Sequence, residues 1–330
     1  MKESARTNLK RVNFSIEYKK TSFMERTKKD FRRNRLLYLM VLPVLAFYIL
    51  FAYVPMYGVV IAFKDFSMKA NMSFFENISN SAFVGVKYFT KFFKSFSFAN
   101  IFFNTVRISF STFIFGFPAP IILALLINEI KSKHFKKIVQ TASYLPYFIS
   151  LVVVCGIIKD FTSDKGVITS LIITMFGGEP QSLLNLKENF LPIYIISDIW
   201  QGVGWGSIIY LAALTGIDPQ LYEAAVIDGA RRWKQTIHIT LPCLIPTITV
   251  MLILRIGGIL NVGYEKIILL QNPLIQDTTD VISTYTYRRG LIDRDWSYSA
   301  AIGLFNSVIN FVFLYFANYI SKKTVETSLW

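Results

Sequence analysis

Three ionisable residues, Arg107, Asp198 and Arg255, lie inside long apolar segments of this 330-residue chain. An ion is costly in hydrocarbon, so such residues usually face a protein interior or a water-filled cavity and often take part in function. Three scattered charges do not make a catalytic constellation, which needs several acids, bases or nucleophiles in mutual reach. We therefore expect ion pairing or contact with a solute, and Asp198 is the expected partner of Arg255.

Aromatic and amide side chains near these charges suit the binding of sugars. Sugar rings have apolar faces that pack on aromatic rings, and their hydroxyl rims hydrogen-bond with amides. The alternatives are interfacial anchoring for the Trp and Tyr side chains and a purely structural role for Arg255. We predict a solute path that includes Trp200, Gln201, Trp205, Arg255, Asn261 and Tyr264.

Small residues follow Trp200 at every second position. Gly202, Gly204 and Gly206 are predicted to form a close helix contact rather than a solute site, because glycine lets two helix backbones approach each other.

Metal, thiol and nucleotide chemistry have little support in the sequence. Cys155 and Cys243 fall in or at the edge of apolar segments, and His134 and His238 have no metal-ligand spacing around them. The sequence also lacks the Gly-x-x-x-x-Gly-Lys-Ser/Thr loop that cradles phosphates. We predict that the chain has no catalytic residue, binds no metal and binds no cofactor of its own.

The composition indicates a membrane protein. Hydrophobic residues make up 53% of the chain, charged residues only 17%, and the mean hydropathy is +0.44, whereas soluble domains contain about 25% charged residues. A helix that crosses the hydrocarbon core needs about 20 apolar residues. The predicted fold is all-α with six transmembrane helices, at 36–63, 101–127, 141–158, 192–214, 242–262 and 300–320.

The basic residues predict the orientation of these spans. Of the net charge of +14, a large share lies in residues 1–35, which hold twelve Lys or Arg and four acids. Basic residues favour the cytoplasmic side, so both termini and the loop at 215–241 are expected there. The predicted parts are a basic cytoplasmic tail at 1–35, a six-span transmembrane domain at 36–320 and a cytoplasmic tail at 321–330. No basic module with interleaved aromatic residues suggests a nucleic-acid partner.

The loop at 215–241 reads as helix, turn and helix. Asp218 followed by Pro219 is typical of a helix start, and Gly229 is typical of a helix end because it tolerates a left-handed backbone. A second amphipathic stretch, 231–240, leads to Pro242 and Pro246, which are predicted to open the fifth span. Such a loop can lie on anionic lipid. Alternatively, its helix of small residues can bind in a cleft of a cytoplasmic partner and transmit a movement of that partner to the next span.

The residues of this loop resemble the EAA motif of permease subunits in bacterial ABC importers. The stretch "EAAVIDGA" is followed by Ile239 and by "LP". On this resemblance the ATPase-coupling residues are Glu223, Ala224, Ala225, Asp228, Gly229, Leu241 and Pro242. The stretches "FGFPAPIILALLINEI", "TASYLPYFIS", "WQGVGWGSIIYLAALTGIDPQLYEAA" and "RIGGILNVGYEKIILLQNPL" are similar to LplB-type polysaccharide and oligosaccharide permeases.

The resemblance implies a type I importer permease with the MetI-like fold, in a bacterial cell membrane. It implies a heterodimer with a second homologous permease, two ATPase subunits that hold ATP and magnesium, and an extracytoplasmic solute-binding protein. The implied solute is an oligosaccharide, with uronate-containing ones among the candidates.

Three other functions are weaker. A permease for a different solute shares the same motifs. An ion-coupled transporter would need charge relays or inverted repeats, and a membrane enzyme would need clustered catalytic groups.

Overall fold

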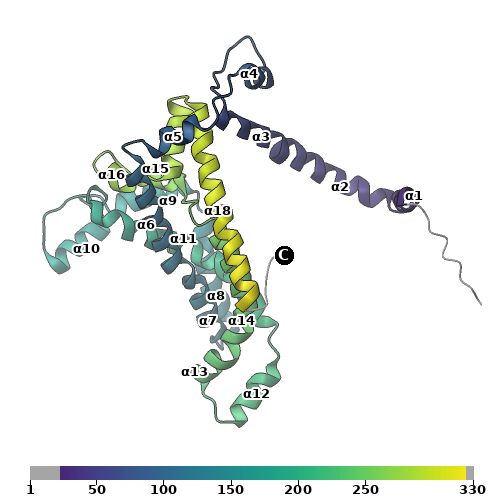
Figure 1. Ribbon diagram of the computed structural model, residues 1–330. Helices are drawn as coiled ribbons and strands as arrows, with labels where there is room; N and C mark the ends of the chain where they lie inside the picture. Colours follow the sequence, from purple (N-terminus) through teal and green to yellow (C-terminus); the bar gives the residue numbers. More distant parts are fainter. Residues whose placement is uncertain (1–22, 325–330) are drawn as a thin grey trace, which may run out of the picture. The chain divides into compact units, whose positions relative to one another are not determined.

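The computed structural model describes residues 23–324, and its secondary structure is helical apart from an isolated antiparallel bridge between Lys64 and Phe83. Figure 1 shows the helices in chain order. The chain divides into two compact units, with the boundary between Gly58 and Val59. Each unit is described by itself.

The first unit consists of helices joined by a bend at Asn34. Asp30 fixes this bend, because its two carboxylate oxygens accept hydrogen bonds from the Asn34 amide and the Tyr38 hydroxyl, each at 2.7 Å. The long apolar helix after the bend buries no residue, as expected of a helix that faces lipid. Part of the predicted tail is thus helical, and residues 1–22 lie outside the described residues. The elements are α1 (Phe23–Arg33), α2 (Arg35–Tyr48), the π-helical η1 (Ile49–Tyr53) and α3 (Val54–Met56).

The second unit opens with the remainder of the first apolar segment and short helices. A capping box stabilises the first of these helices, α4: the Ser73 hydroxyl accepts from the Glu76 amide, and the Glu76 carboxylate accepts from the Ser73 amide. The elements are the 3-10 helix η2 (Tyr57–Phe63, which crosses the unit boundary), α4 (Phe74–Asn80) and α5 (Lys87–Phe93).

Four helical segments within residues 23–324 are long and apolar enough to cross a membrane by themselves: Arg35–Phe63, Phe98–Asn128, Arg232–Ile256 and Trp296–Thr324. They match the predicted spans 36–63, 101–127, 242–262 and 300–320 in position. The second of them joins α6 (Phe98–Gly116) to α7 (Pro118–Asn128), and the last is α18 (Trp296–Thr324). The multi-pass prediction is confirmed, and the count of six remains a prediction.

Two of the observed helices extend beyond the predicted spans. The predicted fifth span begins at Arg232 instead of 242, because α13 (Arg232–Gln235), η5 (Thr236–Thr240) and α14 (Leu241–Ile256) follow one another without a break. Pro242 lies in the first turn of α14, where a missing amide costs no hydrogen bond, and Pro246 lies within the helix. The last helix continues to Thr324, beyond the predicted boundary at 320.

The predicted third span, 141–158, is not one straight helix. The segments Lys133–Phe148 and Leu151–Phe161 meet at an angle of 99°. Pro146 lies in the short 3-10 turn where the first segment ends, and Ser150 starts the next helix by accepting a hydrogen bond from the Val153 amide at 3.4 Å. The elements are α8 (Lys133–Tyr144), the 3-10 helix η3 (Leu145–Phe148) and α9 (Leu151–Phe161).

The predicted span 192–214 lies within α11 (Lys187–Thr215), a single helix of 29 residues. Short elements fill the connections on either side of α11 and before α18. They are α10 (Val167–Phe176), the 3-10 helix η4 (Leu183–Asn185), α12 (Pro219–Ile227), α15 (Tyr264–Leu270), α16 (Gln276–Thr279), α17 (Ile282–Tyr287) and the π-helical η6 (Arg288–Ile292).

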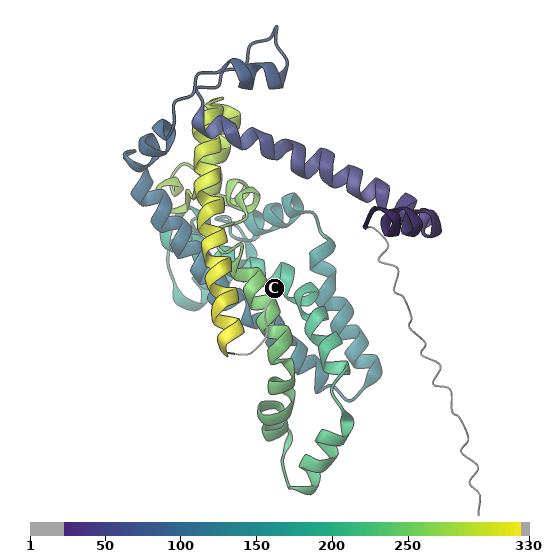
Figure 2. The ribbon, with the colours of Figure 1, turned by 45° about the vertical axis from the view of Figure 1, so that its right-hand side comes forward.

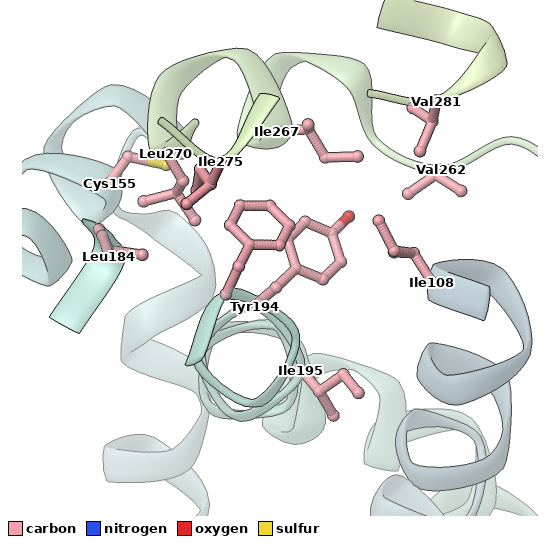
Figure 3. Close-up of a cluster of buried hydrophobic side chains, with 11 residues drawn as sticks. Ile108, Cys155, Leu184, Tyr194, Ile195, Val262, Ile267, Leu270, Ile275 and Val281 are labelled. Atoms are coloured by element: carbon pink, nitrogen blue, oxygen red, sulfur yellow. The ribbon is translucent and has the colours of Figure 1, made fainter. Parts of the chain in front are cut away.

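The largest buried cluster packs α15 and the loops near it onto α11. Figure 3 shows the ring of Tyr194 on α11 facing Ile267 of α15, with Ile108 of α6 close by. Ile267 is fully buried, and Tyr194 is nearly so. The cluster fixes the start of α11 against α15, and this contact positions the charged residues described below.

Glycine allows the closest helix crossing in the second unit. A Cβ on Gly204 would lie 1.9 Å from the backbone oxygen of Ser143 in α8, and one on Gly206 would lie 3.0 Å from the Pro120 ring of α7. A Cβ on Gly202 would meet nothing within 4 Å. Two of the three glycines therefore form the predicted helix contact, and Gly202 does not.

The α12–α13 hairpin projects from one end of the second unit, past the ends of α7 and α8. Figures 1 and 2 show it there from two directions. In both views α5 and the start of α18 lie at the opposite end. The hairpin leads without a break into the long α13–α14 helix.

Candidate functional site: a charged polar cavity and a projecting helix

A polar cavity of about 310 Å³ lies among α6, α11, α14 and the segment that leads into α15. A second cavity of about 210 Å³ lies between α11, α14 and the junction of α6 with α7. Asp198 and Arg255 line both cavities. The two spaces therefore meet at a carboxylate and a guanidinium, which can bind the hydroxyls and the charge of a polar solute.

Asp198 pairs with Lys266 and not with Arg255, so the pairing predicted from the sequence is wrong. Its Oδ1 lies 3.4 Å from the Nζ of Lys266, and within residues 23–324 no ion pair or hydrogen bond forms to the Arg255 side chain. The reason is tertiary: the cluster of Tyr194 and Ile267 brings α15 against α11, so Lys266 reaches Asp198. Lys266 was not predicted as a site residue. Its position in the mostly apolar stretch "YEKIILL" could have indicated a buried cation.

Lys266 is a buried cation. Only 4% of its side chain is exposed, and its Nζ donates to the Tyr194 carbonyl oxygen at 3.4 Å and lies 4.9 Å from the centre of the Tyr194 ring. Burial lowers the pKa of Lys266, and the attraction of Asp198 opposes this shift. The ammonium is compensated by one carboxylate, one carbonyl and one aromatic face.

Three of the six residues predicted for the solute path line the larger polar cavity: Gln201, Arg255 and Asn261. The Gln201 amide donates to the Ile149 carbonyl oxygen at 3.5 Å, which is a long hydrogen bond. The Asn261 side-chain oxygen accepts from Asn306 at 3.0 Å and from Asn310 at 3.1 Å. An asparagine cluster from α18 thus orients Asn261 at the cavity.

Two hydroxyls at this cavity lack a hydrogen-bond partner. Ser109 and Thr112 of α6 both line it, and within the described part of the chain no group pairs with their buried oxygens. An unpaired buried hydroxyl is unfavourable. The space beside them therefore suits a polar occupant.

The three predicted aromatic path residues lie elsewhere. Trp205 stacks on Tyr147, with ring centres 4.7 Å apart and planes at 3°. Tyr264 stacks on Tyr287 at 5.7 Å and donates to Glu265 at 3.3 Å. Neither belongs to the lining of the two polar cavities.

Trp200 lines a third, larger cavity of about 600 Å³ between α9, α10 and α11. Its walls are mostly Ile, Leu and Phe side chains, which offer little to sugar hydroxyls. We therefore base the site on the smaller, charged cavities.

The helix predicted to couple to an ATPase is α12, and its caps match the prediction. The Asp218 carboxylate accepts a hydrogen bond from the Gln220 amide at 2.9 Å. At the other end, the Ala230 amide donates to Ala225 and the Gly229 amide donates to Val226, which is the Schellman arrangement. Gly229 has a φ of 74°, so the positive backbone angle expected of it is confirmed.

The surface of α12 is unusually apolar for an exposed helix. None of its residues is buried, although Leu221, Val226 and Ile227 are large and apolar. Trp233, which follows on α13, is 75% exposed. An exposed apolar patch of this kind is typical of a site for a partner or a membrane surface.

Few contacts tie this hairpin to the rest of the unit. The Tyr222 hydroxyl lies 3.0 Å from the Thr240 hydroxyl of η5, and the Gln235 amide donates to the Ala230 carbonyl at 2.8 Å. Arg232 lies 3.4 Å from Glu129 after α7. These contacts hold α12 on the long helix formed by α13, η5 and α14.

The remaining predicted coupling residues lie on these same elements. Glu223, Ala224 and Asp228 are exposed on α12 and its C-cap, and Ala225 is half-buried. Leu241 and Pro242 occupy the first turn of α14. The structure thus joins the two halves of the predicted motif through one continuous helix that reaches Arg255.

Metal-binding groups are not found in this part of the chain. Within residues 23–324 no set of three or more His, Cys, Asp or Glu side chains could hold a metal ion. Cys155 and Cys243 are both free thiols, the first buried and the second exposed.

Helices that span a membrane, a polar cavity between them and a projecting helix at one end define a membrane transport protein. Residues 116–326 match the family of binding-protein-dependent transport system inner membrane components. The chain belongs to this family and is the membrane permease component of an ABC importer, in which separate subunits hydrolyse ATP.

Two curated relatives from Bacillus subtilis strain 168 cover most of the chain. Protein LplB is 42% identical over 300 residues, which are 91% of this chain and 92% of LplB. The polygalacturonan/rhamnogalacturonan transport system permease protein YteP is 42% identical over 299 residues, which are 90% of this chain and 91% of YteP.

A solved structure shares the fold. A chain of a bacterial alginate ABC transporter, in complex with an alginate pentasaccharide-bound periplasmic protein, is 43% identical, with a TM-score of 0.81. The match covers 91% of this chain and 99% of that chain. The MetI-like permease fold expected from the sequence is confirmed.

Proposed function

We propose that this chain is the permease subunit of an ATP-driven importer for oligosaccharides, and that its solutes include acidic, uronate-containing ones. The observation that carries the proposal is the polar cavity lined by Arg255, Gln201 and Asn261. A guanidinium binds a carboxylate well, and the amides suit sugar hydroxyls. The relatives support it, since one transports polygalacturonan or rhamnogalacturonan and another imports the acidic polysaccharide alginate.

The proposed complex contains a second homologous permease, two ATPase subunits and an extracytoplasmic solute-binding protein. The alginate transporter, which was solved with its periplasmic protein, supports the last of these. ATP and magnesium belong to the ATPase subunits. Both termini and the α12–α13 hairpin face the cytoplasm, a proposal that is supported by the excess of basic residues in 1–35, 129–140, 215–241 and 321–330.

In this proposal α12 is the coupling helix. It docks in a groove of an ATPase subunit through its small and apolar residues, among them Ala224, Ala225 and Val226. When the ATPase subunits close on ATP, α12 moves with them, and the continuous α13–α14 helix carries the movement toward Arg255 at the cavity. Coupling requires that the docked helix favour one ATPase geometry over another.

Alternating access follows from this movement. The solute enters from the binding protein when the cavities open outward, and it leaves when they open to the cytoplasm. The runner-up is a permease for another solute class, such as phosphate or peptides, because the EAA-like residues are shared by such importers.

Reconstitution tests the proposal. The complex, with its partner permease and ATPase subunits, is placed in proteoliposomes and supplied with its binding protein. We expect ATP-dependent uptake of radiolabelled oligogalacturonate, and uptake of neutral oligosaccharides alone would overturn the proposed acidic solutes. Uptake of phosphate or peptides with no uptake of any oligosaccharide would overturn the proposal.

A further inference from the structure

Asp198 is the only acidic residue that lines the two polar cavities, as far as residues 23–324 show. The proposed function uses Arg255 and two amides, and it leaves this carboxylate without a role. Its position where the two cavities meet exposes it to any solute that passes from one to the other.

The Lys266 ammonium beside it is enclosed, although Lys266 belongs to the lining of the larger polar cavity. An ammonium group has three N–H donors. Its neighbours are the Asp198 carboxylate, the Tyr194 carbonyl and the Tyr194 ring, and only 4% of the side chain is exposed. Asp198, with 39% of its side chain exposed, is therefore better placed than Lys266 to meet a solute.

Asp198 retains free acceptor capacity. Its side chain is 39% exposed, and Oδ1 is the oxygen that meets Lys266. Within the described part of the chain, no hydrogen bond forms to Oδ2. An ionised carboxylate has about four lone-pair sites, so several acceptor sites face the cavities.

We propose that Asp198 is a sugar-contacting residue whose carboxylate accepts hydrogen bonds from neighbouring hydroxyls of the saccharide, and that Lys266 is a positioning residue that compensates its charge and fixes its orientation. The inference rests on the proposed function, because it assigns a further group to the same site. Charge-assisted hydrogen bonds of this kind are stronger than neutral ones.

The arrangement selects for a particular chemistry. Arg255 offers a cation, and Asp198, on the same two cavities, offers an anion without pairing with it. A uronate-containing saccharide has both a carboxylate for the guanidinium and hydroxyls for the carboxylate. A small anion such as phosphate could meet the guanidinium but would offer few hydroxyl donors to Asp198, so this pair of charges favours acidic sugars over inorganic anions.

The experiment measures uptake kinetics in the reconstituted complex, with oligogalacturonate as the probe. We expect Asp198→Asn to raise KM about tenfold, which is the usual scale for losing a charged hydrogen bond, with the maximal rate changed less than about twofold. Lys266→Met should raise KM by a similar factor. The double variant should show no further rise, because both changes act through one carboxylate.

A matched control comes from another lysine–aspartate pair. Lys187 and Asp277 form an ion pair at 2.5 Å, with both side chains about half exposed, and neither lines the polar cavities. Lys187→Met and Asp277→Asn should leave KM unchanged. Lys266→Arg, which keeps the cation, should recover part of the affinity that Lys266→Met loses.

Several results would overturn the inference. If Asp198→Asn has a wild-type KM at normal complex levels, Asp198 does not contact the sugar. If Asp198→Asn raises KM and Lys266→Met does not, Lys266 does not position Asp198. Lower complex levels with an unchanged KM in both single variants would show a purely structural pair. If a single variant fails to assemble, the double variant, which removes both charges, supplies the KM. If the wild-type complex takes up no oligosaccharide, the proposed function itself fails.

Discussion

At the scale of single residues, the local chemistry of two positions carries most of the argument. Arg255 is a cation in the last turn of α14, exposed beside two cavities and with no ion pair among residues 23–324, and Gly229 is a turn residue with a positive φ. The first is unfavourable in an apolar environment unless a cavity or a solute meets it. The second needs a backbone that side-chain-bearing residues rarely adopt.

Replacing Arg255 tests whether the cation serves the solute. We expect Arg255→Leu to reduce uptake of an acidic oligosaccharide at least about tenfold, the scale of one charged hydrogen bond, while the ATPase subunits still co-purify. Uptake of a neutral oligosaccharide should fall less. Unchanged uptake of both would remove Arg255 from the path, and a fall that merely follows the protein level would assign it to structure.

A substitution at Gly229 tests the end of α12, the proposed coupling helix. A Cβ at this position would meet nothing within 4 Å, so the only penalty of Gly229→Val is the backbone strain of about 1–3 kcal/mol. We expect weaker co-purification of the ATPase with normal membrane insertion. Gly229→Asn is the matched control, since asparagine tolerates this backbone region, and it should retain the ATPase. Equal behaviour of the two variants would contradict the helix-end account.

At the scale of elements, helix contacts decide which spans form one body. The α11 helix crosses α8 at Gly204 and α7 at Gly206 with almost no room for a side chain. Gly204 and Gly206 of α11 are packed against neighbouring helices, whereas the small residues of α12 are not. The α12 helix buries nothing and leaves Ala224 and Ala225 available to a partner.

The crossing at Gly204 is open to a direct test. Gly204→Ala would bring a methyl group against the Ser143 backbone, which cannot move away as a flexible side chain would, and overpacking typically costs about 1–3 kcal/mol. Gly202→Ala, which meets no neighbour, is the control. We expect a lower melting temperature in detergent for the first variant only. Equal melting temperatures would mean that the helices do not cross this closely.

A larger side chain at Ala225 tests whether α12 docks in an ATPase groove. Ala225→Trp places a large ring on a slim helix, and it should abolish co-purification of the ATPase subunits and the solute-stimulated ATP hydrolysis of the complex. Ala225→Ser, which stays small, should preserve both. Glu223→Gln should have a milder effect, because an exposed ion pair contributes only about 0–1 kcal/mol. An Ala225→Trp complex with wild-type hydrolysis would rule out α12 as the coupling element.

At the scale of the whole molecule, the orientation in the membrane decides on which side an ATPase can dock. The basic residues of the sequence predict cytoplasmic termini, and the coupling proposal needs the α12–α13 hairpin on that side. Exposed positions in the loops allow a labelling experiment in intact cells. They include Glu179 between α10 and η4, Leu274 between α15 and α16, and Lys234 on α13.

Cysteine labelling checks this orientation. Cys243 is exposed, so it is first replaced by serine to remove its background. Cysteines at Glu179 and Leu274 should react from outside with a membrane-impermeant maleimide, and one at Lys234 should react only after permeabilisation. The reverse pattern would invert the topology, and with it the side on which an ATPase could dock.

The sequence by itself determined the class of the molecule and the helix caps of the loop at 215–241. Apolar length, basic residues and the Asp218, Pro219 and Gly229 signals act over a few neighbouring positions, so they can be read without a tertiary structure. The family resemblance was carried by contiguous residues in the same way. Three of the predicted path residues, Gln201, Arg255 and Asn261, also line one cavity, and their contact with a solute stays a prediction.

Only the tertiary structure decided which charges meet. Lys266 reaches Asp198 because the buried cluster around Tyr194 and Ile267 packs α15 onto α11, across 68 residues of sequence. The 99° bend after Phe148 and the unbroken helix from Arg232 to Ile256 likewise differ from the hydropathy prediction. Hydropathy averages composition along the chain, whereas ion-pair partners and helix bends depend on side-chain packing between segments that are distant in sequence.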